Sequence, residues 1–275
     1  MAEHIQLKPG DPKSQLAKRL VSSAFFVTIS VSTIFLAPMW LFALVVEALV
    51  LLSMNEFFSL TQRKQVDVSR PLLFLFAFLL PLAAFNKTGP FVLVLACLFI
   101  FMMNFRRPML SQALISSAVS LFGLVYIAWF LAHLIEMRLL PYGARWTFYV
   151  PLIVKGGDAA AYFTGTRFGK AKLLEHVSPN KSVEGAIGGF IASVILSLCS
   201  KAFLPHVGLG HLLLLGMLTG SICQIGDLAE SLIKRDAGVK DSGQIPGLGG
   251  VLDVLDSLLL TIPFVYYYVV IFIGA

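Results

Sequence analysis

The sequence predicts an all-α, polytopic integral membrane protein with about nine transmembrane helices and a cytoplasmic N-terminus. Its 275 residues are 57% hydrophobic and only 13% charged, about half the charged fraction of a typical soluble domain. The mean hydropathy is +0.85. The apolar residues also fall into runs close to the length of about 20 residues that a bilayer-spanning helix requires. This composition excludes a soluble globular fold, a disordered chain and a nucleic-acid-binding domain.

Nine apolar runs are candidates for membrane spans. The third and fourth are short, and could form a hairpin that does not cross the bilayer completely. Pro38 makes the first connection a tight turn, because proline disfavours helix in the residue before it. In chain order the runs are 20–40, 41–60, 71–85, 90–105, 113–134, 146–162, 186–204, 212–226 and 251–275.

The basic residues alternate between successive connections, which sets the expected orientation of the helices. With the N-terminus in the cytoplasm, 16 of the 21 lysines and arginines lie on the inner side and four on the outer side, while Lys155 lies inside the sixth run. The C-terminus is then outside. Because polar residues become frequent after about residue 140, we expect an apolar bundle of about five spans over residues 1–140 and a catalytic membrane region of about four spans over 141–275.

Few polar features interrupt the first half of the chain. Glu47 lies deep in the second run, where it could pair with another helix, and Glu56 lies near the cytoplasmic end of that run, where water would solvate it. Three cysteines at wide spacing indicate neither a disulfide framework nor a zinc site. We interpret them as small buried hydrophobic residues.

The second half contains three polar clusters on the predicted cytoplasmic side. The first extends from Lys155 to Lys170, and its Asp158 lies about a turn from the end of the sixth run, beside Gly156 and Gly157. Such an aspartate could be a hydrogen-bond partner for another helix or part of a ligand site, and the glycines admit close approach of either. Ionisable residues within the membrane are costly and are functional candidates by default.

The second cluster, residues 178–185, precedes the seventh run. Ser182 or Asn180 can cap that helix, and Glu184 suits its first turn. Capping does not explain Lys181, because the helix dipole disfavours a cation at the N-terminus. An anion such as phosphate at the same helix end would account for this lysine.

The third cluster, residues 227–257, is the richest in charged groups. Asp253 and Asp256 are i,i+3 neighbours at the start of the last run, so their carboxylates point the same way and repel each other. A solvated pair at a helix N-terminus is one explanation. A hard divalent cation such as Mg²⁺, with Asp227 as a third carboxylate, is the better one, because this ion takes oxygen ligands and keeps positions for water and phosphate. One face of the eighth run presents Asp227, Glu230 or Ser231, and Lys234.

Glycines are concentrated between the eighth and last runs, at residues 243–250. Their backbone N–H groups could approach phosphate oxygens. Together with the acids and basic residues on the same side of the bilayer, they suggest metal-assisted chemistry on phosphates, with one soluble phosphate donor and one lipid-borne partner.

The stretch from Ser231 to Asp256 resembles the signature of the phosphatidate cytidylyltransferases (CDP-diacylglycerol synthases), which runs S-x-x-K-R, then K-D, then P-G-H-G-G-x-x-D-R-x-D. The patterns D-x-x-A-Y-x-x-G at 158–165 and S-P-x-K-S-x-E-G at 178–185 are also similar to family segments. Leu248 replaces the usual His and Val254 the usual Arg, which puts in doubt any phosphate contact, proton relay or ion pair made by those groups. We interpret the chain as a variant subgroup, with an impaired or repurposed homologue as the alternative.

The resemblance implies a nucleotidyltransferase that condenses CTP with phosphatidate to give CDP-diacylglycerol and pyrophosphate, in the cell inner membrane with its active site facing the cytoplasm. Mg²⁺ is the expected cofactor, with room for a second cation, and its ligands would be Asp227, Asp253 and Asp256. CTP, phosphatidate and membrane lipids are the expected partners, nucleic acid is not, and a homodimer is left open. The catalytic residues would be Asp227, Asp253, Asp256 and Lys234, and the substrate-binding residues Asp158, Lys181, Ser182, Glu184, Arg235, Lys240, Asp241, Gly249 and Gly250.

Two other functions stay open at this stage. A CTP-dependent lipid kinase acting on a polyprenol would transfer the γ-phosphate and release CDP instead of pyrophosphate. An anion transporter would show inverted repeats and broken helices that meet at mid-membrane. No internal repeat is evident in the sequence, and the polar residues concentrate near one interface.

Overall fold

The computed structural model describes residues 27–105, 110–243 and 249–274, and most of these residues are helical. The first half begins with a helix over Val27–Leu36. Pro38 then precedes the next helix, so the tight turn predicted at this proline is confirmed. The elements that follow are α2 (Met39–Arg63), α3 (Arg70–Ala84), α4 (Gly89–Phe105), η1 (Leu110–Gln112), α5 (Ala113–Gly123), the π-helical η2 (Leu124–Trp129) and α6 (Phe130–Leu139).

The second half adds a short hairpin that the sequence did not lead us to expect. Its two strands are antiparallel, with Lys172 opposite Ser182 and Leu174 opposite Ser178. The elements of this half are α7 (Gly143–Phe168), β1 (Lys172–Leu174), β2 (Ser178–Ser182), α8 (Val183–Cys199), η3 (Ser200–Ala202), α9 (Leu209–Asp236), α10 (Val251–Leu259), α11 (Thr261–Tyr268) and the π-helical η4 (Val269–Ile273).

Five helical segments are long and apolar enough to cross a membrane, which supports a multi-pass membrane protein. Three apolar helices are shorter: Val27–Leu36, α3 and α4. The exact number of crossings stays a prediction. The five long segments are Met39–Arg63, Ala113–Leu139, Val183–Ala202, Leu209–Asp236 and Val251–Ile273.

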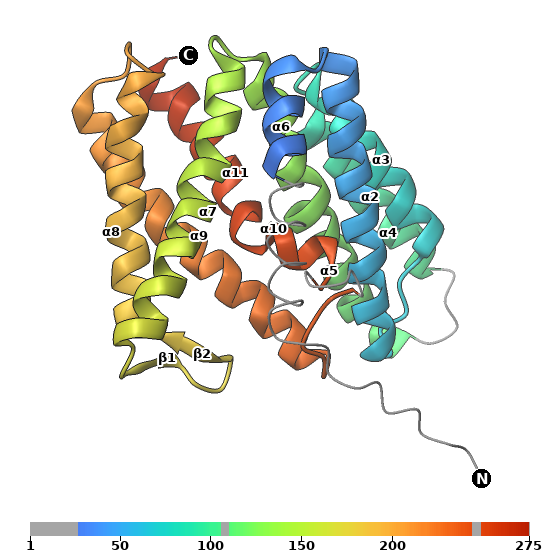
Figure 1. Cartoon of the computed structure of the whole chain (residues 1–275). Helices are drawn as coiled ribbons and strands as arrows, with labels where there is room; N and C mark the ends of the chain where they lie inside the picture. Colours follow the sequence, from blue (N-terminus) through green and yellow to red (C-terminus); the bar gives the residue numbers. More distant parts are fainter. Residues whose placement is uncertain (1–26, 106–109, 244–248, 275) are drawn as a thin grey trace.

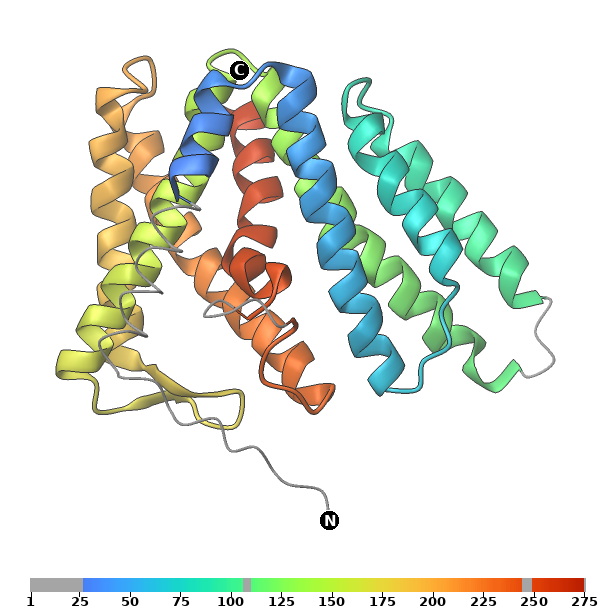
Figure 2. The same ribbon diagram turned by 45° about the vertical axis from the view of Figure 1, so that its right-hand side comes forward.

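Successive connections alternate between the two ends of the bundle (Figures 1 and 2). The connections α2–α3, α7–α8 and α9–α10 lie at one end, and the second of these contains the hairpin. The connections α3–α4, α6–α7 and α8–α9 lie at the other end, as does the end of η4. We call the end with the hairpin the polar end, because most of the basic residues of the described chain lie in its connections or in the helix ends beside them. Which end faces the cytoplasm stays a prediction.

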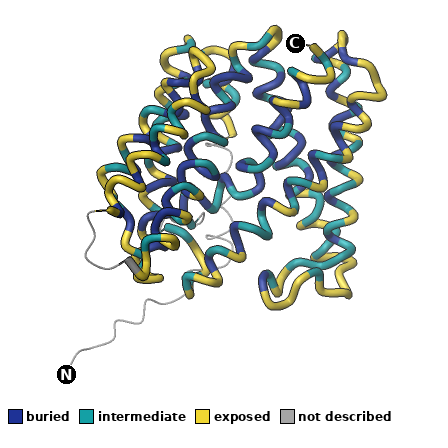
Figure 3. Tube along the Cα trace, turned by 180° about the vertical axis from the view of Figure 1, so that it is seen from behind, coloured by how far each residue is buried: buried dark blue, intermediate teal, exposed yellow. Residues whose placement is uncertain are grey.

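The buried residues follow the inward faces of the helices, and the exposed residues lie mainly outside (Figure 3). Trp146 and Tyr149 of α7 are completely buried, whereas Leu114, Phe163 and Ile271 each expose more than 60% of their surface. Apolar surface of this extent is compatible with lipid as solvent. Of the three free cysteines only Cys223 is buried, and Cys199 is exposed, so the expectation that all three are buried was wrong.

Candidate active site

A cavity of about 700 Å³ lies between α7, the hairpin, α8, α9 and α10. We call it the acidic cavity, because four carboxylates from three helices line it together with two lysines. Serine, threonine and amide side chains and a few apolar groups complete its wall. The charged residues are Lys155 and Asp158 from α7, Lys181 from β2, Asp227 from α9, and Asp253 and Asp256 from α10.

Glycines bring the helices of this cavity into close contact. A Cβ atom at Gly157 would lie 2.4 Å from the Ser193 hydroxyl oxygen, so α7 approaches α8 more closely than a side chain would allow. A Cβ atom at Gly226 would lie 2.9 Å from the carbonyl oxygen of Asp256. Because Gly226 directly precedes Asp227, this close approach of α9 to α10 sets Asp227 against the helix that carries Asp256.

The carboxylates of the cavity are paired with lysines. Lys181 Nζ lies 2.5 Å from Asp227 Oδ2, which joins the hairpin to α9. Lys155 Nζ lies 3.5 Å from Asp158 Oδ2 and 3.8 Å from Asp256 Oδ1. Ser257 completes this second group, since it accepts a hydrogen bond from Lys155 at 3.1 Å and donates one to Asp158 at 3.0 Å. The cavity therefore contains ion pairs in which an anionic ligand could replace the carboxylate beside a lysine, and a cation could replace the lysine beside a carboxylate.

Asp253 is engaged by protein donors on both of its oxygens. Lys234 pairs with Oδ1 and also with Glu230. Oδ2 accepts hydrogen bonds from Ser242 N at 2.8 Å, Ser242 Oγ at 2.9 Å and Gly250 N at 2.6 Å. Asp253 is the third residue of α10, and the hydrogen bond that it accepts from the N–H of the N-cap residue, Gly250, is one half of a capping box.

The three aspartates predicted as metal ligands, Asp227, Asp253 and Asp256, all line the acidic cavity. Within residues 27–105, 110–243 and 249–274, no three His, Cys, Asp or Glu side chains form a group that could hold a metal ion. Asp253 does not fit as a ligand, because its oxygens already accept four hydrogen bonds or ion pairs. Asp227 and Asp256 line the same cavity and offer the oxygen donors that Mg²⁺ takes, since proteins bind this ion through one or two carboxylates plus water and substrate phosphates. A metal ion at this pair stays a prediction.

Glu56 was expected to be simply solvated, and this expectation was wrong. Its Oε1 accepts a hydrogen bond from Val251 N at 2.8 Å, and its Oε2 accepts from Leu252 N at 2.9 Å and from Ser242 Oγ at 2.7 Å. A carboxylate from the first half of the chain thus contacts the start of α10. The only indication in the sequence is the position of this acid near the end of an apolar helix. That position does not predict which residues Glu56 contacts.

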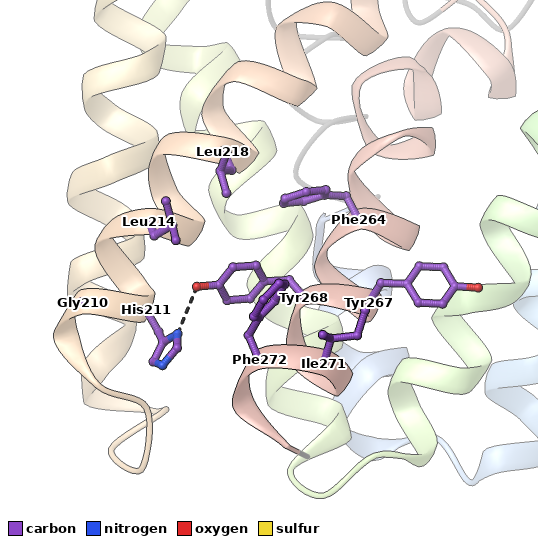
Figure 4. Close-up of a pocket in the computed structure, with 9 residues that line it drawn as sticks. All are labelled: Gly210, His211, Leu214, Leu218, Phe264, Tyr267, Tyr268, Ile271 and Phe272. Carbon is purple, nitrogen blue, oxygen red and sulfur yellow. Dashed lines mark hydrogen bonds between the residues drawn. The ribbon is translucent and has the colours of Figure 1, made fainter.

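A second cavity, of about 560 Å³, lies between α9 and α11 (Figure 4), towards the end of the bundle that is opposite the hairpin (Figure 1). Its wall is apolar apart from His211, whose Nδ1 lies 3.0 Å from the Tyr268 hydroxyl, and the hydroxyl of Tyr267 points away from it. It has no charged cluster, so we place the candidate active site in the acidic cavity.

Comparison with known proteins gives the family. Residues 17–272 match the model described as the cytidylyltransferase family. The chain belongs to the cytidylyltransferase family. This finding confirms the resemblance noted for residues 158–257 and extends it over most of the chain.

Three relatives are named phosphatidate cytidylyltransferase. The Bacillus subtilis (strain 168) protein is 40% identical over 154 residues, which are 54% of this chain and 56% of the relative. The Haemophilus influenzae protein is 42% identical over 151 residues, 50% and 52% of the two chains. The chain thus spans about half the length of these two relatives. The Synechocystis protein is 31% identical over 286 residues, 92% of this chain and 96% of the relative.

Several residues of the cytidylyltransferase signature have structural contacts near the cavity. Ser182 lines the cavity and accepts a hydrogen bond from Gly185 N at 3.1 Å, so its predicted capping of α8 is confirmed. Glu184 lies in the first turn of α8, as predicted, and its carboxylate accepts a hydrogen bond from the backbone N–H of Lys170 at 3.0 Å. Arg235 donates to the carbonyl oxygens of Val177 and Val239, which ties the end of α9 to the hairpin.

The remaining predicted residues lie outside the cavity wall. Lys234 is buried between Glu230 and Asp253, while Lys240 and Asp241 are exposed. Gly249 has a φ of +82°, and a Cβ atom there would lie 2.6 Å from Asp253 Oδ2. Leu248 lies outside the described residues, and Val254 belongs to α10.

The signature glycines therefore approach carboxylates of the chain itself. Gly250 behaves in the same way, because a Cβ atom there would lie 2.3 Å from Glu56 Oε2. The approach of these glycines to phosphate stays a prediction. Lys155, by contrast, lines the cavity although it was not among the predicted site residues. Only its position inside an apolar run could have singled it out.

Proposed function

We propose that this chain condenses CTP with phosphatidate to give CDP-diacylglycerol and pyrophosphate. The observation that carries the proposal is the acidic cavity, in which Lys155 and Lys181 face Asp227 and Asp256. Membership of the cytidylyltransferase family and the names of the three relatives support the same reaction.

The chemistry requires screening of negative charge and does not require a nucleophile from the protein. An oxygen of the phosphatidate phosphate attacks the α-phosphorus of CTP, a new P–O bond forms, and the bond to the β-phosphate oxygen breaks, so that pyrophosphate leaves. Both reactants are anions, and such transfers depend mainly on positioning and on electrostatic stabilisation. The two cavity lysines are suited to this task, because their side chains are 28% and 40% exposed and can reach a bound phosphate.

Substrate binding would rearrange the charge pairs of the acidic cavity. A phosphate that contacts Lys181 competes with Asp227 for the ammonium group, and a phosphate near Lys155 competes with Asp158 and Asp256. The carboxylates released in this way would be Asp158, Asp227 and Asp256, and the last two are the proposed ligands of a divalent cation. Mg²⁺ held by this pair would supply charge neutralisation at the phosphates.

The polar end of the bundle would face the cytoplasm of a cell whose inner membrane holds the protein. The predicted excess of basic residues on this side and the solubility of CTP both favour that orientation. Phosphatidate would come from the bilayer itself. Lys181, Ser182 and the neighbouring hairpin would form the side of the cavity that CTP reaches from water.

The decisive experiment incubates the purified full-length protein in detergent with CTP, phosphatidate and Mg²⁺. We expect release of pyrophosphate that depends on both substrates, together with transfer of label from [α-³²P]CTP into lipid. A CTP-dependent lipid kinase would release CDP and would leave the α-phosphate label in solution. Product analysis therefore separates the two reactions, and absence of both products would refute the proposal.

A further inference from the structure

The start of α10 is capped by a side chain that lies far away in the sequence. The first N–H groups of a helix have no partner within the helix and are usually satisfied by the residue just before it. Here that residue is Gly250, which has no side chain. Glu56 of α2 takes over this role by accepting hydrogen bonds from Val251 N and Leu252 N, across a sequence separation of 195 residues or more.

The glycines around this contact leave room for the carboxylate. A Cβ atom at Gly250 would lie 2.3 Å from Glu56 Oε2, and one at Gly243 would lie 2.6 Å from Glu56 Oε1. Real Cβ atoms do not approach an oxygen so closely, so both positions must be glycine while Glu56 is in place. Two independent observations therefore support the contact between Glu56 and the start of α10. The glycines leave space for the carboxylate, and the backbone N–H groups donate hydrogen bonds to it.

A second contact joins the C-terminal end of α2 to the end of α9, which precedes α10 in the chain. Lys64 Nζ lies 2.9 Å from Asp236 Oδ1 at the end of α9. Ser242 Oγ lies between the two capping acids, 2.7 Å from Glu56 Oε2 and 2.9 Å from Asp253 Oδ2. Helix α2 and the residue that directly follows it therefore contact both the last residue of α9 and the first turn of α10.

We propose that Glu56 is a positioning residue of the active site, which caps α10 from α2 and thereby fixes the direction in which Asp256 projects into the acidic cavity. This inference rests on the function proposed above for that cavity. Glu56 does not line the cavity wall and acts only through α10. Without the cap, the first turn of α10 would fray, and Asp256 would lose its position opposite Lys155 and beside Asp227.

The test compares Glu56→Gln with Glu47→Gln. Glu47 lies on the same helix, and its buried oxygens have no hydrogen-bond partner among the described residues, so it is a matched control for replacement of a carboxyl group of α2 by an amide. An amide at residue 56 turns an N–H₂ group towards a backbone donor, and at least one capping bond is lost. In Glu56→Gln we expect the Val251 and Leu252 amides to exchange hydrogen about tenfold faster, the order of effect of a lost helix cap.

Activity is the second readout of the same variants. We expect kcat of Glu56→Gln to fall on the order of tenfold to a hundredfold, as for small misplacements of catalytic groups, with KM for CTP little changed. Glu47→Gln should keep the wild-type exchange and kcat. Wild-type exchange and kcat in Glu56→Gln would overturn the inference, and so would equal losses in the two variants.

A further variant decides the matter if Glu56→Gln does not fold. Ser242→Ala removes the hydroxyl between Glu56 and Asp253 and leaves α2 intact. We expect a smaller fall in kcat and faster exchange confined to the start of α10, and wild-type values for both would overturn the inference. Inactivity of the wild-type protein would refute the proposed function instead, while the exchange comparison would still test the cap.

Discussion

Lys181 of the hairpin and Asp227 of α9 form an ion pair of 2.5 Å on the wall of the acidic cavity. The sequence placed a lysine where a helix dipole disfavours it, and the structure shows a carboxylate beside that lysine. Each member is about one quarter exposed, so both can exchange partners. This pair is the point at which we expect substrate binding to change the arrangement of charges in the cavity.

Replacement of Lys181 by alanine should lower kcat/KM by about tenfold to a hundredfold. The lost group would contribute a charged hydrogen bond to phosphate, which is worth about 1.5–3 kcal/mol. Steady-state kinetics with varied CTP would measure the effect. Lys172→Ala is the control, because Lys172 lies in the same hairpin and donates to the Pro179 carbonyl oxygen. A similar loss in both variants would show that the hairpin, and not this ammonium group, is what matters.

Replacement of Asp256 by asparagine should reduce kcat by on the order of a hundredfold or more, as expected for a group that stabilises charge in the transition state. Excess EDTA should abolish the wild-type activity, and added Mg²⁺ should restore it. Glu175→Gln, at an exposed acid between the two strands of the hairpin, should remain active. Activity that persists in EDTA would contradict the proposed role of a cation.

Lys234 should affect stability more than substrate binding. Replacement by methionine leaves Glu230 and Asp253 without a cation, although their side chains are 0% and 10% exposed. Removal of one partner from a buried pair costs about 3–5 kcal/mol. We expect a large fall in the melting temperature in detergent, and almost none for Lys240→Met at an exposed position. Equal melting temperatures for the two variants would disprove a structural role for Lys234.

Gly226→Ala should impair activity through the backbone. The new Cβ atom would lie 2.9 Å from the Asp256 carbonyl oxygen, so α9 and α10 must separate. Overpacking of this kind costs about 1–3 kcal/mol and would move Asp227 away from Asp256. Gly210→Ala is a control on the same helix, since a Cβ atom there meets nothing within 4 Å. Alanine at 210 should preserve both stability and kcat, and the same behaviour at 226 would refute the requirement for close helix approach.

Much of the fold follows from the pattern of apolar residues. The runs predicted over 41–60 and 113–134 correspond to α2 and to the continuous segment from α5 through α6. The short runs over 71–85 and 90–105 are short helices in the structure as well. Local periodicity predicts such elements because a bilayer-spanning helix satisfies its own backbone and needs only length and apolar side chains.

The candidate site was predictable only in part. Asp158, Lys181, Asp227 and Asp256 are brought into one cavity, as the clustering of polar residues suggested. Helical spacing indicated that Asp253 and Asp256 share a face. It could not show that Ser242 and Gly250, which precede α10, donate hydrogen bonds to the Asp253 carboxylate. The contact between Glu56 and α10 joins distant parts of the chain, and no local pattern encodes it.

The exposure of Tyr162 predicts the depth at which the acidic cavity lies in the membrane. Tyr162 lines the cavity wall, yet it is 67% exposed and is followed by the equally exposed Phe163. Aromatic rings in such positions settle at the level of lipid headgroups, so the mouth of the cavity would open at the height of the lipid phosphates. A phosphatidate molecule could then enter sideways from its own leaflet with its acyl chains still in the bilayer. Phosphatidate would then reach the cavity by lateral diffusion in the plane of the bilayer. The rate of its binding would depend on the number of phosphatidate molecules per unit membrane area and not on their bulk concentration.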